Sequence, residues 1–332
     1  MDGSSEIPAE YADVVEGLRS HDLRVESVLG RGGVGVVFAA TRGDEPVAVK
    51  LAWPWPKAEE RLDDAVTQQR LRQPLVTNEG HALHCVTPAS LAVCNRVVQG
   101  EATRLLDTAD AAVVRCLGRV QVGPRHGYLM PRVPGGALPL TPGPALVTLA
   151  RALRRLHEAE WPHGDLKPEN VRVAEDGSVT LIDPLPIGCE LLTPSWTHLN
   201  FLVASPLVDS ADPRDRRMVA RHRDLVAFAL MTAQAFGGSR PWGHLEVTRI
   251  LDRAVSSPTK RNDLSTARDR LQSLLPKVPK TVRTLVALAL EPGIWPEEGP
   301  IFAAYLQARP FETRCDALST LDIGALMAQA VG

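Results

Sequence analysis

Four polar residues near the middle of the chain have the types and the spacing to act on a metal-bound substrate. Asp165, Lys167 and Asn170 lie within residues 163–170, and Asp183 follows that stretch closely. Carboxylate and amide oxygens are ligands that Mg²⁺ accepts, and a carboxylate with a neighbouring lysine can orient a hydroxyl nucleophile. These residues therefore predict a site that holds a divalent cation and positions a hydroxyl group.

The residues between the two carboxylates predict the element that carries them. Residues 171–173 are a short apolar run, residues 175–177 (Glu-Asp-Gly) have the composition of a tight turn, and residues 179–182 are a second apolar run. Two short β-type runs joined by a turn that contains glycine predict a β-hairpin. We expect this hairpin to bring Asp183 beside Asp165.

A glycine-rich turn near the N-terminus predicts a phosphate-binding backbone. Residues 23–29 alternate between apolar and polar, residues 36–40 are β-rich, and three glycines lie between them: Gly30, Gly32 and Gly35. Glycines remove the Cβ atoms and leave N–H groups accessible to phosphate oxygens. A strand rather than a helix follows the turn, so it does not fit the dinucleotide-binding fingerprint. Residues 47–50 predict a third strand, which ends in the cation Lys50.

These stretches resemble, in the same order, the motifs of eukaryotic-like (Hanks-type) Ser/Thr protein kinases. The matching stretches are Gly30-x-Gly32-x-x-Gly35-x-Val37, Val47-Ala48-Val49-Lys50, His163-Gly164-Asp165-Leu166-Lys167-Pro168-Glu169-Asn170 and Ile182-Asp183. The resemblance covers residues 20–245 well and implies an α+β, bilobal fold with a small β-rich N-lobe and a larger helical C-lobe. It implies an N-terminal extension over residues 1–20, an N-lobe over 21–133 and a C-lobe over 134–332.

The resemblance also assigns roles to individual residues. Asp165 would accept the proton of a substrate hydroxyl or orient it, and Lys167 would neutralise the transferred phosphoryl group. Asn170 and Asp183 would hold Mg²⁺. The glycine turn would cover the phosphates of ATP, and Lys50 would hold the α- and β-phosphates. The residues implied to bind ATP are Gly30, Gly32, Gly35, Val37, Ala48, Lys50, Glu79, Met130, Pro131 and Val133.

Lys50 needs an acidic partner from the next helix, and two stretches compete for that role. Residues 57–72 have a strongly helical pattern and include Glu59 and Glu60, close to Lys50 in the sequence. Residues 78–83 are more similar to the E-x-x-x-L helix of the family, with Glu79 as the acid. We favour Glu79 and interpret residues 57–73 as an inserted helix.

Residues 128–136 resemble the hinge between the two lobes. Met130 would lie at the back of the nucleotide pocket, the carbonyl of Pro131 would accept from the adenine amino group, and the Val133 N–H would donate to the ring. Proline lacks only the N–H group, which this scheme does not use. Helical patterns follow at 146–159, 263–275, 281–290, 299–307 and 314–330, and residues 224–230 resemble the long buried helix of the C-lobe.

Three positions depart from the family pattern. Gly164 stands where many kinases carry an arginine that pairs with an activating phosphate, so we expect activity that does not require phosphorylation of segment 193–197. Pro184-Leu185 follows the metal ligand Asp183 in place of Phe-Gly. Leu207 takes the place of the acid in the A-P-E motif.

Composition restricts the class of protein and of partner. The 332 residues are 44% hydrophobic and 23% charged, which is typical of a globular protein, and the formal net charge is −2 with no basic block. We therefore expect neither nucleic acid nor a membrane as a partner. Five scattered cysteines without C-x-x-C spacing favour reduced thiols, and with no signal peptide we expect a cytoplasmic protein.

The sequence predicts a protein Ser/Thr kinase that uses ATP and Mg²⁺ and acts on a protein substrate. Two alternatives stay open. His-Gly-Asp at 163–165 and Ile-Asp-Pro at 182–184 also resemble aminoglycoside and choline kinases, although Lys167-Pro168-Glu169 and the complete glycine turn argue against that class. A pseudokinase scaffold is the second alternative, since the Asp-Pro-Leu motif is unusual. The substrate and the oligomeric state do not follow from the sequence.

Overall fold

The chain folds into a mixed structure of α-helices and β-strands that divides into two compact units. The computed structural model describes residues 7–32, 34–54, 75–76, 82–83, 91–186, 212–238, 269, 272–290 and 316–332. Described residues before 55, those from 91 to 134 and those from 180 to 186 belong to the first unit, and those from 135 to 179 and beyond 211 belong to the second. The mixture of elements agrees with the expected α+β class.

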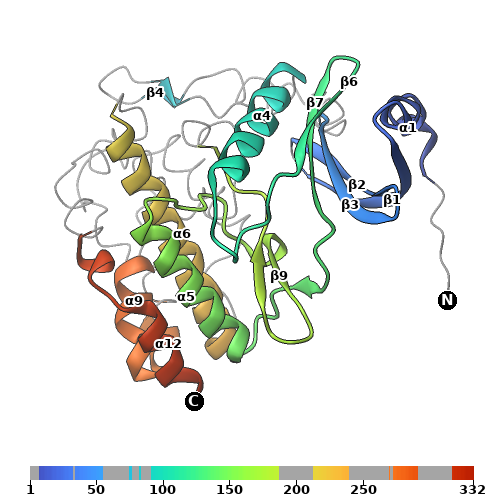
Figure 1. Cartoon of the computed structure of the whole chain (residues 1–332). Helices are drawn as coiled ribbons and strands as arrows, with labels where there is room; N and C mark the ends of the chain where they lie inside the picture. The colour runs from blue at the N-terminus through green and yellow to red at the C-terminus, as the bar shows by residue number, and fades with distance from the viewer. Residues whose placement is uncertain are drawn as a thin grey trace. The chain divides into compact units, whose positions relative to one another are not determined.

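A five-stranded antiparallel sheet forms the centre of the first unit (Figure 1). Its strands are β1 (Leu23–Arg31), β2 (Gly35–Arg42), β3 (Glu45–Ala52), β6 (Gly118–Val122) and β7 (Arg125–Pro131), in the spatial order β1-β2-β3-β7-β6. The predicted strands at 23–29, 36–40 and 47–50 are confirmed, because alternating or β-branched runs between turn residues suit a half-buried sheet. Val120–Val122 lies in β6, whereas Val113 makes only an isolated bridge to Leu181.

The N-terminal segment packs into the core of this sheet. A short 3-10 turn η1 (Ala9–Tyr11) leads into α1 (Ala12–Arg19), whose buried residues Val14 and Leu18 stand four residues apart on one face. The ring of Tyr11 meets that of Phe38 of β2 edge to face, with centroids 5.3 Å apart. Leu18 is fully buried in the same cluster. Residues predicted to be an extension thus contribute directly to the hydrophobic core.

Helix α4 (Leu91–Asp107) is an element that the sequence analysis did not predict. It packs against β7 and β3 (Figure 1). Its buried face includes Cys94, Val97, Val98 and Leu105, at the spacing of an amphipathic helix. The helix therefore covers the sheet at the strand that carries Lys50.

The helix predicted around Glu79 is contradicted at its end. Ala82 and Leu83 form the short strand β5 (Ala82–Leu83), which pairs with β4 (Leu75–Val76). Asn78 and Gly80 are poor helix formers, so the stretch had little intrinsic preference for a helix. Glu79 itself lies outside the described residues, as do Glu59, Glu60, the predicted inserted helix at 57–73, and Leu207.

The second unit is built mainly of packed helices (Figure 1). They are α5 (Pro144–Glu158), α6 (Pro213–Gly237), α9 (Lys280–Leu290) and α12 (Ile323–Val331), with the 3-10 turn η3 (Leu275–Lys277) before α9. Helix α12 packs against α5 and α9, and α6 packs against α5 and α9. The predicted helices at 146–159 and 281–290 are confirmed, and that at 314–330 is confirmed in its later part. The predicted helix at 299–307 lies outside the described residues.

A short hairpin follows the stretch that carries Asp165. The 3-10 turn η2 (Pro168–Asn170) leads into β9 (Val171–Val173), which lies between β8 (Gly136–Ala137) and β10 (Val179–Leu181). The predicted hairpin is thereby confirmed. The turn closes with a bond from the Ala174 N–H to the Ser178 carbonyl at 3.0 Å. Among the described helices, none has the length and apolar character needed to cross a membrane.

Candidate functional site

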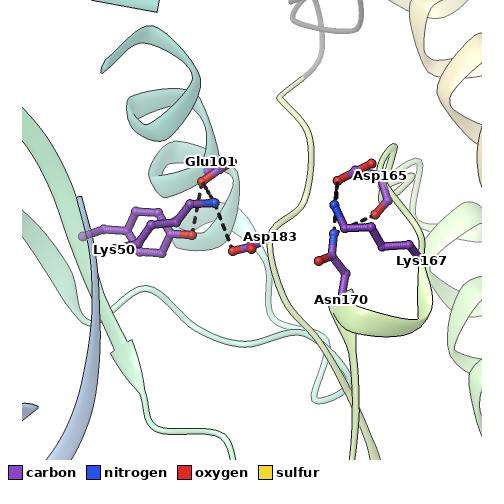
Figure 2. Close-up of polar contacts among 7 residues, drawn as sticks. Lys50, Glu101, Asp165, Lys167, Asn170 and Asp183 are labelled. Atoms are coloured by element: carbon purple, nitrogen blue, oxygen red, sulfur yellow. Dashed lines mark hydrogen bonds and ion pairs between the residues drawn. The ribbon is translucent and has the colours of Figure 1, made fainter. Parts of the chain in front are cut away.

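Lys50 is the centre of a buried charged cluster in the first unit (Figure 2). Its Nζ lies 2.8 Å from Oε2 of Glu101 and 3.1 Å from Oδ1 of Asp183. The side chains of Lys50 and Glu101 are 5% and 4% exposed, whereas that of Asp183 is 27% exposed. Asp183 is therefore the carboxylate of the cluster that a dissolved cation can reach.

Three elements bring these groups together. Strand β3 lies inside the sheet between β2 and β7, and Lys50 on this strand is buried. Helix α4 lies over this strand and supplies Glu101. The end of β10 is anchored by Leu181, whose N–H donates to the Ala112 carbonyl at 2.7 Å and whose carbonyl accepts from the Val114 N–H at 3.0 Å. Two residues later, Asp183 adopts a left-handed backbone conformation with φ 57°, which aspartate tolerates better than most residues.

Glu101 is the acidic partner of Lys50 that sequence reasoning missed. Because Glu101 and Leu105 stand four residues apart on one helical face, both are buried toward the sheet. Glu101-Ala-Thr-Arg-Leu105 matches the same E-x-x-x-L pattern that drew attention to Glu79. The signal was therefore present in the sequence, and the correction is that Lys50 pairs with Glu101 of α4.

Burial and charge act against each other in the Lys50 cluster. Burial favours a neutral lysine, but the carboxylates of Asp183 and Glu101 outweigh it and raise the pKa of Lys50. Burial raises the pKa of Glu101 to about 7, opposed by Lys50 and reinforced by Asp183. The hydroxyl of Tyr128 donates to Oε2 of Glu101 at 3.3 Å. One ammonium group thus serves two carboxylates, a combination that favours the approach of a further cation.

The glycine turn between β1 and β2 is closed by backbone hydrogen bonding, with the Gly32 N–H 2.8 Å from the Gly35 carbonyl oxygen. A Cβ atom on Gly35 would lie 2.7 Å from the carbonyl oxygen of Leu51, so packing requires glycine there. A Cβ atom on Gly30 would have no described neighbour within 4 Å, and one on Gly32 would meet only the Gly35 carbonyl at 3.9 Å. Packing among the described residues therefore does not explain the glycines at 30 and 32.

The other predicted nucleotide-binding residues of the first unit lie on three adjacent strands. Val37 on β2 is opposite Lys50 on β3, and Ala48 on β3 is opposite Met130 on β7. Pro131 ends β7, and Val133 follows two residues later, next to the point where the chain passes into the second unit at Gly135. Met130 and Ala48 are both buried. The sheet thus brings Val37, Ala48, Lys50 and Met130 together on neighbouring strands.

Asp165 is the centre of a second cluster, which lies in the second unit (Figure 2). Its Oδ2 lies 2.8 Å from Nζ of Lys167 and accepts a hydrogen bond of 3.1 Å from Nδ2 of Asn170. The same Nδ2 donates to the Asp165 carbonyl at 2.8 Å. Burial raises the pKa of Asp165, but the charges of Lys167, Arg223 and His163 outweigh it, and the net pKa is lowered. Asp165 is therefore ionised at neutral pH.

Asp224 of α6 holds the backbone next to Asp165, a role that the sequence analysis did not assign. Its Oδ1 accepts from the Gly164 N–H at 2.7 Å, and its Oδ2 accepts from the His163 N–H at 2.7 Å and is 2.9 Å from Nε2 of His157. Gly164 has φ 84°, a conformation that favours glycine over arginine. A lone acid beside the apolar run 225–231 was the available signal, because a buried carboxylate needs partners.

Hydrogen bonding fixes the Asn170 side chain with its amide oxygen left to bind a metal ion. Its amide nitrogen makes both bonds to Asp165, so the amide oxygen is directed away from that residue (Figure 2). The predicted ligands Asn170 and Asp183 belong to the second and the first unit, respectively. Within the described residues, no group of three or more His, Cys, Asp or Glu side chains is arranged to hold a metal ion.

The second unit has a cavity of about 400 Å³, which is lined by residues of α5, of α6 and of the stretch before α12. Asp165, Lys167 and Asn170 do not line it. Four arginines and four acids line it, and two of these arginines are paired with acids of the lining: Arg154 with Glu158 and Asp322, and Arg217 with Glu160. The lining is therefore balanced in charge and has no marked attraction for an anion.

Comparison with models of known protein families and with curated protein sequences found no match for this chain.

Proposed function

We propose that this chain is a protein Ser/Thr kinase, which transfers the γ-phosphoryl group of ATP to serine or threonine hydroxyls. The first unit would act as the N-lobe and the second as the C-lobe of a bilobal kinase-like fold. The observation that carries the proposal is the buried pairing of Lys50 with Glu101 and Asp183. A lysine held between a helix carboxylate and a second, more exposed carboxylate suits the binding of charged phosphates beside a metal ion.

The Asp165 cluster supports the chemical step. An ionised Asp165 can accept a hydrogen bond from a substrate hydroxyl and align its oxygen with the γ-phosphorus. As the new oxygen–phosphorus bond forms, the bond from the γ-phosphorus to the β–γ bridging oxygen breaks, and its electron pair leaves with ADP. The hydroxyl proton passes to Asp165 and then to solvent. Lys167, bound to Asp165 at 2.8 Å, supplies positive charge to the transferred group.

The partly exposed carboxylate of Asp183 suits a magnesium ion of the kind used with nucleotides. Mg²⁺ in such sites is bound by one or two protein oxygens together with phosphate oxygens and water, so it needs no dedicated protein cage. Asp183 would offer its more exposed carboxylate and Asn170 its amide oxygen. When bound, the ion neutralises charge on the β- and γ-phosphates.

The glycine turn supports the binding of phosphates. Gly30 and Gly32 do not have positive φ, and a Cβ atom at either position would clash with no described atom. Neither backbone conformation nor packing among the described residues therefore asks for glycine at these two positions. A ligand that approaches the bare backbone closely would ask for it.

The proposal is tested by incubating the purified chain with γ-labelled ATP, Mg²⁺ and generic protein substrates. We expect label on protein serine or threonine. Asp165→Asn should abolish transfer while nucleotide binding stays within about threefold of the parent, since Asp165 acts on the hydroxyl. Asp183→Asn should abolish transfer and also weaken binding of ATP with Mg²⁺. Asp176→Asn, an exposed change in the hairpin turn, is the matched control and should behave as the parent.

The outcomes separate the competing functions. Label on an amino alcohol or an aminoglycoside, with none on protein, would replace the proposal with small-molecule phosphotransfer. Nucleotide binding with no transfer to any acceptor would indicate a pseudokinase. If Asp165→Asn and Asp183→Asn both match the parent in every assay, the kinase assignment is wrong.

A further inference from the structure

The segment that follows Asp183 is packed against helix α4 within the first unit. Pro184, Leu185 and Pro186 are all buried. Pro184 and Leu185 occupy the place where the resemblance leads one to expect Phe-Gly after Asp183. Glu101, the partner of Lys50, lies on the same helix. The position of Asp183 relative to Glu101 therefore depends on how this segment meets α4.

Gly100 makes the first of two contacts between residues 184–186 and α4. A Cβ atom on Gly100 would lie 2.7 Å from both Cβ and Cγ of Pro186, closer than real Cβ contacts come. The proline ring therefore lies directly on the bare backbone of α4, one residue before Glu101. Glycine inside a helix costs about 1 kcal/mol relative to alanine, so its presence here calls for a packing reason, which the contact with Pro186 supplies.

Arg104 makes the second contact, one helical turn along. Its Nη1 donates to the carbonyl oxygen of Leu185 at 2.5 Å. A cationic donor to a buried carbonyl is stronger than a neutral hydrogen bond. Gly100 and Arg104 stand four residues apart, so they lie on one face of α4. Glu101 lies between them in the sequence, next to Gly100.

We propose that Gly100 and Arg104 are positioning residues, which clamp the segment 184–186 onto α4 and thereby hold Asp183 and Glu101 on the same Lys50 ammonium group. Insofar as Asp183 binds Mg²⁺, the inference rests on the proposed function. The clamp keeps the metal ligand and the helix carboxylate in one arrangement. The Lys50 cluster is then assembled before any substrate arrives.

The test compares Arg104→Met, Arg104→Lys and, as a matched control, Arg96→Met, an exposed arginine on the same helix. Hydrogen exchange is measured at the amides of residues 181–183 and 185, and the Mg²⁺ concentration for half-maximal phosphoryl transfer is measured in parallel. Arg104→Met should speed exchange at these amides about fivefold and raise that concentration about fivefold, as the loss of one hydrogen bond predicts. Arg104→Lys should recover part of both effects, and Arg96→Met should show neither.

A second pair of variants tests the glycine contact. Gly100→Ala should speed hydrogen exchange at the same amides. The effect should be smaller when Pro186→Gly is also present, because the added methyl group then meets no proline ring. Equal exchange in the parent and in Arg104→Met would overturn the inference. So would faster exchange throughout the first unit, which would indicate a general effect on stability. If no protein of the series transfers phosphate but the amides of residues 181–183 and 185 respond as described, the proposed function fails and the clamp stands.

Discussion

Asp224 and Gly164 are joined by a hydrogen bond of 2.7 Å, in which a buried carboxylate on α6 accepts from the N–H group of the residue before Asp165. The same carboxylate also accepts from the His163 N–H. A long helix thereby fixes the backbone of the loop that carries Asp165, the proposed catalytic base. The loop needs no contact with its own substrate to hold this shape.

The Asp224 carboxylate makes stability depend on pH in the acid range. Burial raises the pKa of Asp224, but the hydrogen bond and charge of His157, the charge of His163 and the Gly164 N–H bond outweigh it, so the net pKa is lowered. The folded state then binds fewer protons than the unfolded state, and this stability, present above pH 4 or so, is lost as pH falls below it. Asp224→Asn should cost about 2 kcal/mol at pH 7 and flatten the loss in acid.

Urea denaturation at several pH values measures this effect. Asp107→Asn, an exposed change at the end of α4, is the control and should stay within about 0.5 kcal/mol of the parent. A parallel acid profile for the parent and Asp224→Asn would contradict the prediction.

The raised pKa of Glu101 predicts that stability falls as pH rises near neutrality, opposite to the effect of Asp224. Burial raises the pKa of Glu101 to about 7, above the value of 4.5 that is usual for glutamate. The folded state therefore binds more protons, and the stability from this group is present below about pH 4.5 and lost as pH rises through 7. Glu101→Gln should remove this loss, so the variant should gain stability relative to the parent between pH 5 and pH 8. If the difference in stability between Glu101→Gln and the parent stays the same from pH 5 to pH 8, the prediction of a raised Glu101 pKa is wrong.

Phosphoryl transfer should respond to the same variant. Glu101→Gln leaves Lys50 with a single ionised partner, and we expect kcat/KM to fall about tenfold, equivalent to about 1.4 kcal/mol. Measured rates with limiting ATP check this. A rate equal to that of the parent would show that the Lys50–Glu101 pair is structural only.

The glycines of the β1–β2 turn should separate into two classes. Gly35→Ala places a Cβ atom against the Leu51 carbonyl oxygen and should lower the melting temperature. A Cβ atom on Gly32 would meet no described atom closer than the Gly35 carbonyl oxygen at 3.9 Å, so Gly32→Ala should melt as the parent does but bind ATP about tenfold more weakly, which is about 1.4 kcal/mol. Thermal melts with and without ATP and Mg²⁺ distinguish these effects. Normal ATP binding by Gly32→Ala would refute the assigned role of the turn.

Activity should not require phosphorylation of segment 193–197. Gly164 has no cationic side chain to pair with a phosphate on this segment. The contacts of Gly100 and Arg104 with residues 184–186 hold Asp183 in place without such a phosphate. Alanine at Thr193, Ser195 and Thr197, all outside the described residues, should leave the transfer rate within about threefold. A loss of about a hundredfold, or about 2.7 kcal/mol, would show that a phosphate is needed and that another cation receives it.

The sequence could predict elements whose pattern is local, and it failed where packing decides. Alternation of apolar and polar residues was enough to predict β1, and β-rich runs next to turn residues were enough to predict β2 and β3. Spacing was enough for the group around Asp165. The partner of Lys50 could not be chosen, since stretches containing Glu79 and Glu101 share one pattern and only tertiary packing selects α4. Asp224 was missed for a similar reason, because its partners are backbone N–H groups far away in the sequence.

The raised pKa of Lys50 bears on how small molecules can be aimed at this protein. An amine that stays protonated at neutral pH is a poor nucleophile, and this one is also shielded from solvent. Lysine-directed acylating reagents should therefore modify exposed surface lysines and spare Lys50. A compound designed for the cluster has a better target in the more exposed Asp183 carboxylate, where a cationic group can bind without displacing the Glu101 ion pair.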